Sequence, residues 1–204
     1  MFKKYYLTEW SFFKKKLRFI FLILLLLLIL LSFSTYSYFI KYPERAKSTL
    51  FDYVKTFRKA GLYGENSFKV FVKLFLNNLT FSLGATLLGF IPFLFLPVIA
   101  IMHLSAQVGL VISLNELFVK QNQLKFLTFL SPHGVFEIPA IIYAAAIGVY
   151  LSIQISRKVI PWTKHNSLPF PTLCKQASRS FVLIVVPLLL IAAFVETFIT
   201  PSQL

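Results

Sequence analysis

The chain has 204 residues, of which 57% are hydrophobic, and 21 Lys and Arg residues against seven Asp and Glu give a formal net charge of +14. In a soluble domain such a charge would suggest nucleic-acid binding, but there is no RNA-binding or zinc motif, and the basic residues mostly flank apolar runs, as expected for contact with anionic lipid headgroups. We therefore expect a membrane protein without a nucleic-acid partner. The single cysteine, Cys174, excludes an intramolecular disulfide, and the length suits one multi-span domain without a separate soluble catalytic domain.

The first predicted element is a membrane anchor at residues 19–40, preceded by a basic leader at residues 1–18. An apolar run from Phe19 to Phe33 extends through a Ser- and Tyr-containing tail to Ile40, and this gives about 22 uncharged residues where about 20 span a bilayer core. A cleavable signal peptide is the alternative. The run is long for that purpose and residues 34–38 offer no Ala-x-Ala cleavage site, so an uncleaved anchor is favoured.

Residues 41–67 are predicted to form an amphipathic helix that ends near Gly61 and Gly64. Lysines and arginines lie off an apolar stripe that recurs at three- and four-residue steps. The stripe consists of Leu50, Tyr53, Val54, Phe57 and Ala60. Such a helix lies at the membrane interface or, as the alternative, packs on the rest of the protein.

The second and third spans are predicted within Leu74–Phe118. This stretch of about 45 residues carries one charge, Glu116, and is too long for a single span. Pro92 and Pro97 mark the expected turn, because proline lacks an N–H group and disfavours helix at the residue before it.

The fourth and fifth spans are predicted at Val135–Ile155 and Phe181–Ile199, joined by a polar connector at Ser156–Ser180. Residues 68–201 would form a four-span bundle, followed by a tail at residues 202–204. The predicted fold is an all-α integral membrane protein with five transmembrane helices and an interfacial amphipathic helix after the first.

The orientation depends on the first helix. With the N-terminus inside, 11 basic residues lie inside and 10 outside, so the tally does not distinguish the two orientations. The dense basic leader favours a cytoplasmic N-terminus in a bacterial plasma membrane, because the first helix usually dominates orientation.

Ladders of small residues predict which spans pack together, because small side chains let helix backbones approach closely. The ladders are Ala140, Ala144, Gly148 and Ser152 in the fourth span and Ser105, Gly109 and Ser113 in the third. The first span has Leu where these have Gly, Ala or Ser. We expect spans two to five to form a compact bundle with the first span at its edge, facing lipid.

Polar side chains at the span ends are the candidate functional residues, since such groups are costly at membrane depth. They are Asn77 and Asn78 at the start of the second span, Asn115 and Glu116 at the end of the third, His133 and Glu137 at the start of the fourth, and Glu196 at the end of the fifth. Alternating helix direction puts all these ends on one side of the membrane. If Pro132 opens the helix, His133 and Glu137 share one face.

Three interpretations of this polar cluster remain open: a structural knot of interhelical hydrogen bonds, a proton or ligand path, and hydrolytic chemistry. One His with three carboxylates is too loose a set to indicate a metal, so neither a metal nor a cofactor is predicted. His103 and Gln107, four apart in mid-span, are expected to form a packing hydrogen bond.

Several of these residues form a pattern with their neighbours. In chain order it runs from Asn77-Asn78 through Pro132-His133-Gly134, Glu137, Pro139-Ala140 and Gly148 to Ala192-Ala193, Glu196 and Thr200-Pro201. The pattern resembles the stage II sporulation protein M family over roughly Phe68–Pro201, and its Pro-His-Gly…Glu…Pro-Ala stretch is the most specific part. The resemblance implies a small multi-pass membrane protein of bacteria or archaea. The sporulation member of the family acts as membrane anchor and scaffold for a peptidoglycan-degrading complex, and many relatives occur in organisms that do not sporulate.

We therefore expect a non-enzymatic membrane scaffold or subunit that recruits other cell-envelope proteins. A permease or permease subunit that uses the polar cluster is the main alternative. An intramembrane hydrolase is a weaker one, since no Ser/His pair of the usual sort, His-Glu-x-x-His motif or paired aspartate is present. The nearly apolar mid-sections of spans one, four and five favour the scaffold. No partner identity or oligomeric state follows from the sequence.

Overall fold

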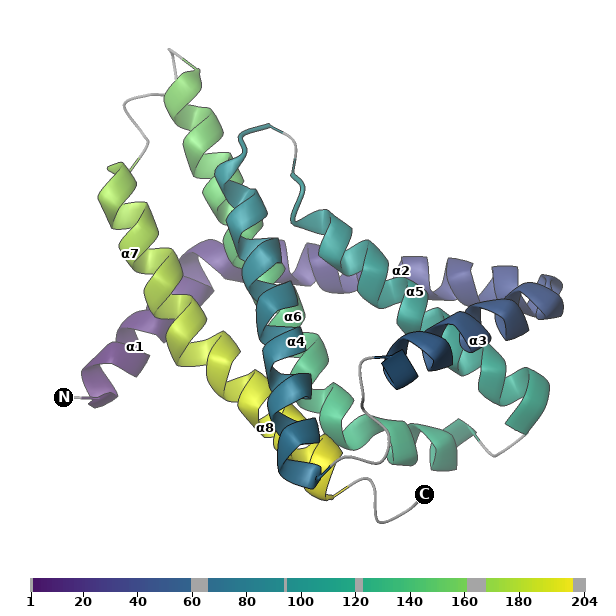
Figure 1. Cartoon of the computed structure of the whole chain (residues 1–204). Helices are drawn as coiled ribbons and strands as arrows, with labels where there is room; N and C mark the ends of the chain where they lie inside the picture. The colour runs from purple at the N-terminus through teal and green to yellow at the C-terminus, as the bar shows by residue number, and fades with distance from the viewer. Residues whose placement is uncertain (1, 60–65, 94, 120–122, 161–167, 200–204) are drawn as a thin grey trace.

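Every regular element in the described part of the chain is a helix (Figure 1). The computed structural model describes residues 2–59, 66–93, 95–119, 123–160 and 168–199, without the side chains of residues 2–4, 53–54, 56–59, 119 and 123–133. The helices are α1 (Phe2–Phe12), α2 (Arg18–Lys41), α3 (Pro43–Lys59), α4 (Ser67–Leu87), α5 (Val98–Leu114), α6 (Gln123–Val159), α7 (Phe170–Ser180) and α8 (Val186–Phe198). Short π-helical stretches join α1 to α2 and α7 to α8 and extend α5 to Val119.

Five helical segments among the described residues are long and apolar enough to cross a membrane. They are Tyr5–Lys41, Ser67–Phe90, Val98–Phe118, Gly134–Val159 and Phe170–Phe198. This confirms the predicted all-α, five-span membrane fold. The amphipathic helix expected after the first span is α3.

The turn between the second and third spans lies where the prolines predicted it. After α4 comes a single 3₁₀ turn, and α5 begins at Val98 with Pro97 as its N-cap residue. Phe93 and Phe95 adopt positive φ angles of 67° and 45°, so the chain between the helices is irregular. The prediction of two helices within Leu74–Phe118 is confirmed.

Two serines of α6 satisfy part of this irregular backbone. The Ser152 hydroxyl donates to the carbonyl oxygen of Ile91 at 3.1 Å, and the Phe93 N–H donates to the Ser156 hydroxyl at 2.9 Å. Backbone N–H and C=O groups outside regular helices need such partners wherever the protein buries them. The four-residue spacing that makes the α6 ladder therefore continues through Ser156 and fixes the α4–α5 turn.

The core is built around α6, which packs against α4, α8 and α2 (Figure 1). Its Ala144, Ile147 and Leu151 pack with Leu173 of α7 and Leu189 of α8, all fully buried. Another strip of α6, which includes Ile142 and Ala145, contacts α2 and α5. In Figure 1, α4, α6 and the α7–α8 helix run together, whereas α2 extends to one side with α5.

The first span contacts the other spans more closely than predicted. Its α2 packs along α5, where a Cβ atom added to Gly109 would lie 2.6 Å from the Ser32 carbonyl oxygen. The third-span ladder thus faces the first span, and not one of the other three. The first span also has a small residue at this contact, the buried Ser32, just before Phe33 at the end of its Leu-rich run. The opposite face of α2 is exposed, as expected for a span at the edge.

Three helices extend beyond their predicted limits. The basic leader is helical as α1, and the second half of the predicted connector is helical as α7, continuous with the fifth span. The connector prolines do not prevent this, because Pro169 is the N-cap of α7 and Pro171 lies in its first turn, where a missing N–H is harmless. Likewise α6 begins at Gln123, so Pro132 does not open it.

Helix α3 packs on the protein at its start. Ala46 is buried beside Phe39 of α2 and Leu110 of α5, while Leu50 on the predicted apolar stripe is exposed. The other stripe side chains and the two glycines at the predicted end lie outside the described residues. The contact at Ala46 fits the packed alternative at this end of the helix.

Candidate functional site

The predicted polar residues of α4, α6 and α8 lie on three helices that pack together. Asn77 and Asn78 are neighbours in the middle of α4 and not at the start of the span as predicted, because the helix already begins at Ser67. Nδ2 of Asn77 is 3.4 Å from Oδ1 of Asn78. Glu137 on α6 and Glu196 on α8 are both half-buried. The rings of Phe71 and Phe198 are 6.1 Å apart, so the start of α4 lies beside the end of α8. The His133 side chain lies outside the described residues, and its approach to Glu137 stays a prediction.

Glu116 is attached to the first span. The Tyr36 hydroxyl of α2 donates a hydrogen bond to the Glu116 carboxylate, across 80 positions in the chain. Asn115, the preceding residue, is buried at the end of α5. The bond joins the end of the third span to the end of α2, on the side of the molecule where these two helices run together (Figure 1).

The ladder residues of α6 form the closest helix contact. A Cβ atom added to Gly148 would lie 2.5 Å from the Ala85 carbonyl oxygen and 2.7 Å from Cγ of Pro97, and one added to Gly89 would lie 2.1 Å from the Gly148 carbonyl oxygen. The α4 and α6 backbones therefore touch at two glycines. One turn away, the Thr86 hydroxyl donates to the Ala144 carbonyl oxygen at 3.1 Å. Ala140 is also fully buried.

The serines of the α5 ladder, Ser105 and Ser113, are buried as well, and each hydroxyl donates to a carbonyl of its own helix. The hydrogen bond predicted between His103 and Gln107 is present at 3.2 Å. It lies within α5, and the His103 ring is 5.3 Å from the Phe81 ring of α4. These groups serve helix geometry and helix packing.

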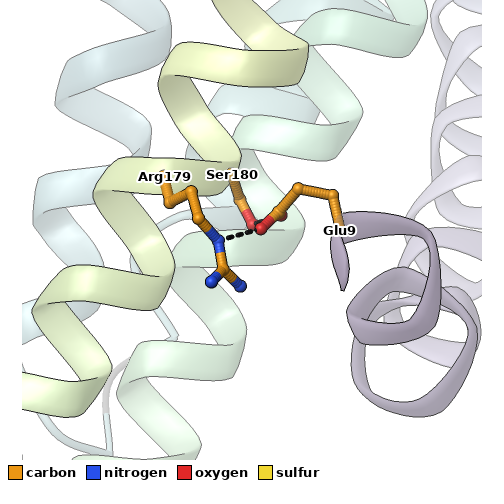
Figure 2. A network of polar contacts seen from close by, with 3 residues as sticks. All are labelled: Glu9, Arg179 and Ser180. Atoms are coloured by element: carbon orange, nitrogen blue, oxygen red, sulfur yellow. Dashed lines mark hydrogen bonds and ion pairs between the residues drawn. The ribbon is translucent and has the colours of Figure 1, made fainter. Parts of the chain in front are cut away.

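The most deeply buried charge among the described side chains is one that was not predicted from the sequence. Glu9 of α1 is 1% exposed; its carboxylate accepts hydrogen bonds from the Arg179 guanidinium and the Ser180 hydroxyl of α7. Figure 2 shows the Glu9 side chain reaching from α1 toward both partners. The Arg179 side chain remains 25% exposed. The pair joins the first helix to α7 across about 170 positions, which limits the freedom of both more than a local pair would.

Aromatic contacts hold α1 in the same place. The rings of Phe13 and Tyr143 stack at 5.7 Å, and Phe12 meets Tyr150 edge to face at 5.4 Å. A signal for this docking exists in the sequence: Glu9 is the only acid before Glu44, and it lies among aromatic residues. The sequence prediction considered only the lysines of the leader and therefore missed its aromatic face, which includes Phe12 and Phe13.

The chemistry of this cluster is structural. A carboxylate that is hydrogen-bonded to a guanidinium and a hydroxyl is charge-compensated, which is the condition for keeping a carboxylate buried. Ser180 uses its proton to bond the carboxylate, and among the described residues no set of three or more His, Cys, Asp and Glu is arranged to hold a metal ion. The cluster is suited to locking two helices together.

A family model for stage II sporulation protein M matches residues 19–201, which is most of the chain. The chain belongs to the stage II sporulation protein M family. No curated protein and no solved structure matches it.

In this member of the stage II sporulation protein M family, the Glu9 cluster crosses the edge of the family match. Arg179 and Ser180 lie inside the matched range, and Glu9 lies in the leader before it. The glycine contact and the Tyr36–Glu116 bond are wholly inside. The family region therefore contains the five-span architecture, and the leader adds a helix that is fastened to it.

Proposed function

We propose that this protein is a non-enzymatic scaffold or membrane subunit of a cell-envelope complex in a bacterial plasma membrane. The observation that carries the proposal is the outer face of α2. One side of this helix packs on α5 and α6 through Leu24 and Leu28. The other side is apolar and exposed over the first two thirds of the helix, at Phe19, Leu22, Ile23, Leu26, Ile29, Leu30 and Phe33. An apolar face of this kind can receive the transmembrane helix of another protein.

The use of buried polar groups in the core supports a scaffold over a permease. Thr86 and Ser152 donate to backbone carbonyls of neighbouring segments, and Ser156 accepts from the Phe93 N–H. These bonds fasten helices and the α4–α5 turn to α6. A permease would need polar side chains arranged along a route for its substrate, and these are committed to helix packing.

The basic leader supports a cytoplasmic N-terminus and contact with anionic lipid. Lys14, Lys15, Lys16 and Arg18 are exposed, and each lysine or arginine near a negatively charged leaflet adds about 1 kcal/mol of attraction. The Glu9–Arg179 contact requires α1 and α7 to lie on the same side, which five spans allow. We propose that α1, α7 and the α4–α5 turn are cytoplasmic, with α3 on the opposite side.

The native Cys174 on α7 tests the orientation. In intact cells, a membrane-impermeant maleimide should leave Cys174 unlabelled, and a permeant one should label it. The matched variant Cys174→Ser with Ser48→Cys places the thiol on exposed α3, where the impermeant reagent should react. Labelling of Cys174 and protection of residue 48 would reverse the orientation.

The scaffold role is tested by photo-crosslinking in native membranes. A photoreactive phenylalanine at position 26, where the leucine is 57% exposed, should give a protein adduct of defined mass. The same group at position 28, which is 6% exposed, should give only internal crosslinks. Two results together would favour the permease. Positions 22, 26 and 30 would give adducts with lipid alone, and reconstituted protein would show a proton flux that Glu137→Gln or Glu196→Gln abolishes.

A further inference from the structure

A cavity of about 410 Å³ lies beside the Glu9 cluster, between α1, the start of α2, α6 and the α7–α8 helix. It is partly open to its surroundings, and Trp10 in its wall is 56% exposed, so a membrane lipid can enter it from the side. Rings from three helices and aliphatic chains from the last span form most of its wall, which includes Trp10, Phe13, Phe21, Tyr143, Ile184 and Leu188. Such a wall accommodates an apolar chain.

The one charged group in the wall does not call for a charged ligand. Glu9 is almost completely buried, and Arg179 and Ser180 already bind its carboxylate. Its charge is compensated from the side of α7, outside the cavity wall. The Tyr143 ring beside it is stacked on Phe13. The interior therefore selects for a hydrocarbon chain.

Basic side chains stand at the edge of the cavity. Nζ of Lys14 lies 4.9 Å from the ring centroid of Trp10, a wall residue, so its charge is held at the cavity margin. Lys15, Lys16 and Arg18 follow within one turn and are exposed. An ammonium group next to an apolar cavity is complementary to a ligand with a hydrocarbon chain and an anionic head.

We propose that this cavity binds one anionic glycerophospholipid of the surrounding membrane, with an acyl chain against Trp10, Tyr143 and Leu188 and the headgroup phosphate at Lys14. The lipid would complete the joint between α1 and the α6–α8 core that Glu9 and Arg179 begin. This assignment is independent of the scaffold role. The cavity wall is formed mainly by α1, α6 and the last span, and it includes none of the residues named above for the exposed face of α2.

Trp10 itself reports on the site. The chain has two tryptophans, Trp10 and Trp162, so Trp162→Phe leaves a single fluorophore in the cavity wall. This full-length variant is placed in phosphatidylcholine nanodiscs with increasing fractions of phosphatidylglycerol brominated on its acyl chains. Quenching of Trp10 should saturate at a low mole fraction, at least tenfold below the fraction of brominated phosphatidylcholine that gives equal quenching. Quenching proportional to mole fraction and equal for both lipids would show bulk lipid contact only and would overturn the proposal.

Matched variants in the same background separate the chain site from the head site. Leu188→Phe fills the cavity and should weaken the saturable phase at least tenfold, whereas Leu190→Phe, on the exposed face of the same helix, should change it less than twofold. Lys14→Gln should weaken phosphatidylglycerol binding about fivefold, as expected for one lysine at an anionic surface. Lys41→Gln is its control, since Lys41 makes the corresponding contact with Tyr42 at the far end of the span.

Lys14 is exposed, so its variant tests the site even if Leu188→Phe does not fold. Equal binding by the Lys14 and Lys41 variants would contradict the proposed head site. A photo-crosslinking result at position 26 does not affect either outcome, because residue 26 is not in the cavity wall.

Discussion

The first and fourth spans have opposite relations between hydrophobicity and burial. The first is the more hydrophobic of the two, yet 22% of its most apolar window is buried in the protein, against 78% for the fourth. The first is rich in Leu and Phe, and the fourth carries Ala140, Ala144, Gly148 and Ser152 on its packing face. In a membrane, hydrophobicity keeps a helix in the bilayer, whereas small side chains determine how closely it approaches its neighbours.

This difference separates two roles within one bundle. The fourth span is a rigid centre whose backbone touches that of α4 and whose serines bind the α4–α5 turn. The first span packs on α5 and α6 along one side, with Leu24 and Leu28 buried there, and its opposite side is exposed. The proposed scaffold role would use this difference, with the enclosed fourth span holding the bundle together and the exposed face of the first span receiving a partner.

The largest loss of stability is expected when the glycine contact between α4 and α6 is removed. Gly148→Leu should lower stability by about 3 kcal/mol or more, or prevent folding, because a Cβ atom there would lie 2.5 Å from the Ala85 carbonyl oxygen and backbone cannot move aside cheaply. Gly84→Leu is the matched control, since no atom lies within 4 Å of a Cβ atom at that position. Thermal unfolding in detergent measures both. Equal melting temperatures would mean that α4 and α6 do not touch at Gly148.

Removing Arg179 and removing Glu9 should lower the stability of the protein by different amounts. Arg179→Met leaves the Glu9 carboxylate, 1% exposed, without its cation and should cost about 3 kcal/mol. Glu9→Met should cost only about 1 kcal/mol, because the partly exposed Arg179 can turn to water or headgroups. The double variant should recover most of the loss, since two apolar side chains can replace a buried pair. Additive losses in the double variant would contradict a direct Glu9–Arg179 interaction.

Forcing the first span away from the third with a larger residue at position 109 should cause an intermediate loss of stability. Gly109→Leu would place side-chain atoms against Ser32 and Thr35 of α2 and should cost about 2 kcal/mol, below Gly148→Leu because α2 is held elsewhere as well. Proteolysis of the α2–α3 segment should become faster while the α4–α6–α8 core stays protected. Unchanged protection of α2 would mean that its contact with α5 does not depend on Gly109.

The smallest effect is expected on the open face. Leu26→Ala should change stability by less than about 0.5 kcal/mol in a bilayer, because its side chain is exposed and exchanges contact with lipid only. Leu28→Ala, one half-turn away and buried against α5 and α6, should cost about 1 kcal/mol through lost packing. Both are measured by reversible unfolding in bicelles. A larger loss at position 26 than at position 28 would reverse the assignment of the two faces.

Much of the fold follows from local sequence signals. Pro92 and Pro97 identified the turn inside a long apolar run, and the small residues around Gly148 lie in the packed centre. No helix was predicted in the leader or in the second half of the connector, because charge and proline content do not by themselves indicate one. Pro169 and Pro171 are compatible with a helix start, and Lys14, Lys15 and Lys16 of the leader are exposed.

The candidate site was less accessible to sequence reasoning. Helix direction brings the start of α4 and the end of α8, which carries Glu196, to one end of the bundle, whereas Asn77 lies in the middle of α4. Which carboxylate is paired with which partner depends on helix rotation and on contacts across 80 or 170 positions, as for Glu116 with Tyr36 and Glu9 with Arg179. Periodicity within one segment contains no information about such pairs.

The central claim is that small residues, and not hydrophobicity, set which span is enclosed. Its most direct test uses the unmodified protein in nanodiscs that contain a lipid with a photoactivatable carbene in its acyl chain, followed by peptide mapping of the insertion sites. The structure predicts that residues 19–33 are labelled several times more densely than residues 140–152, although both segments are apolar. Labelling of equal density in the two segments, or denser labelling of the fourth span, would contradict it.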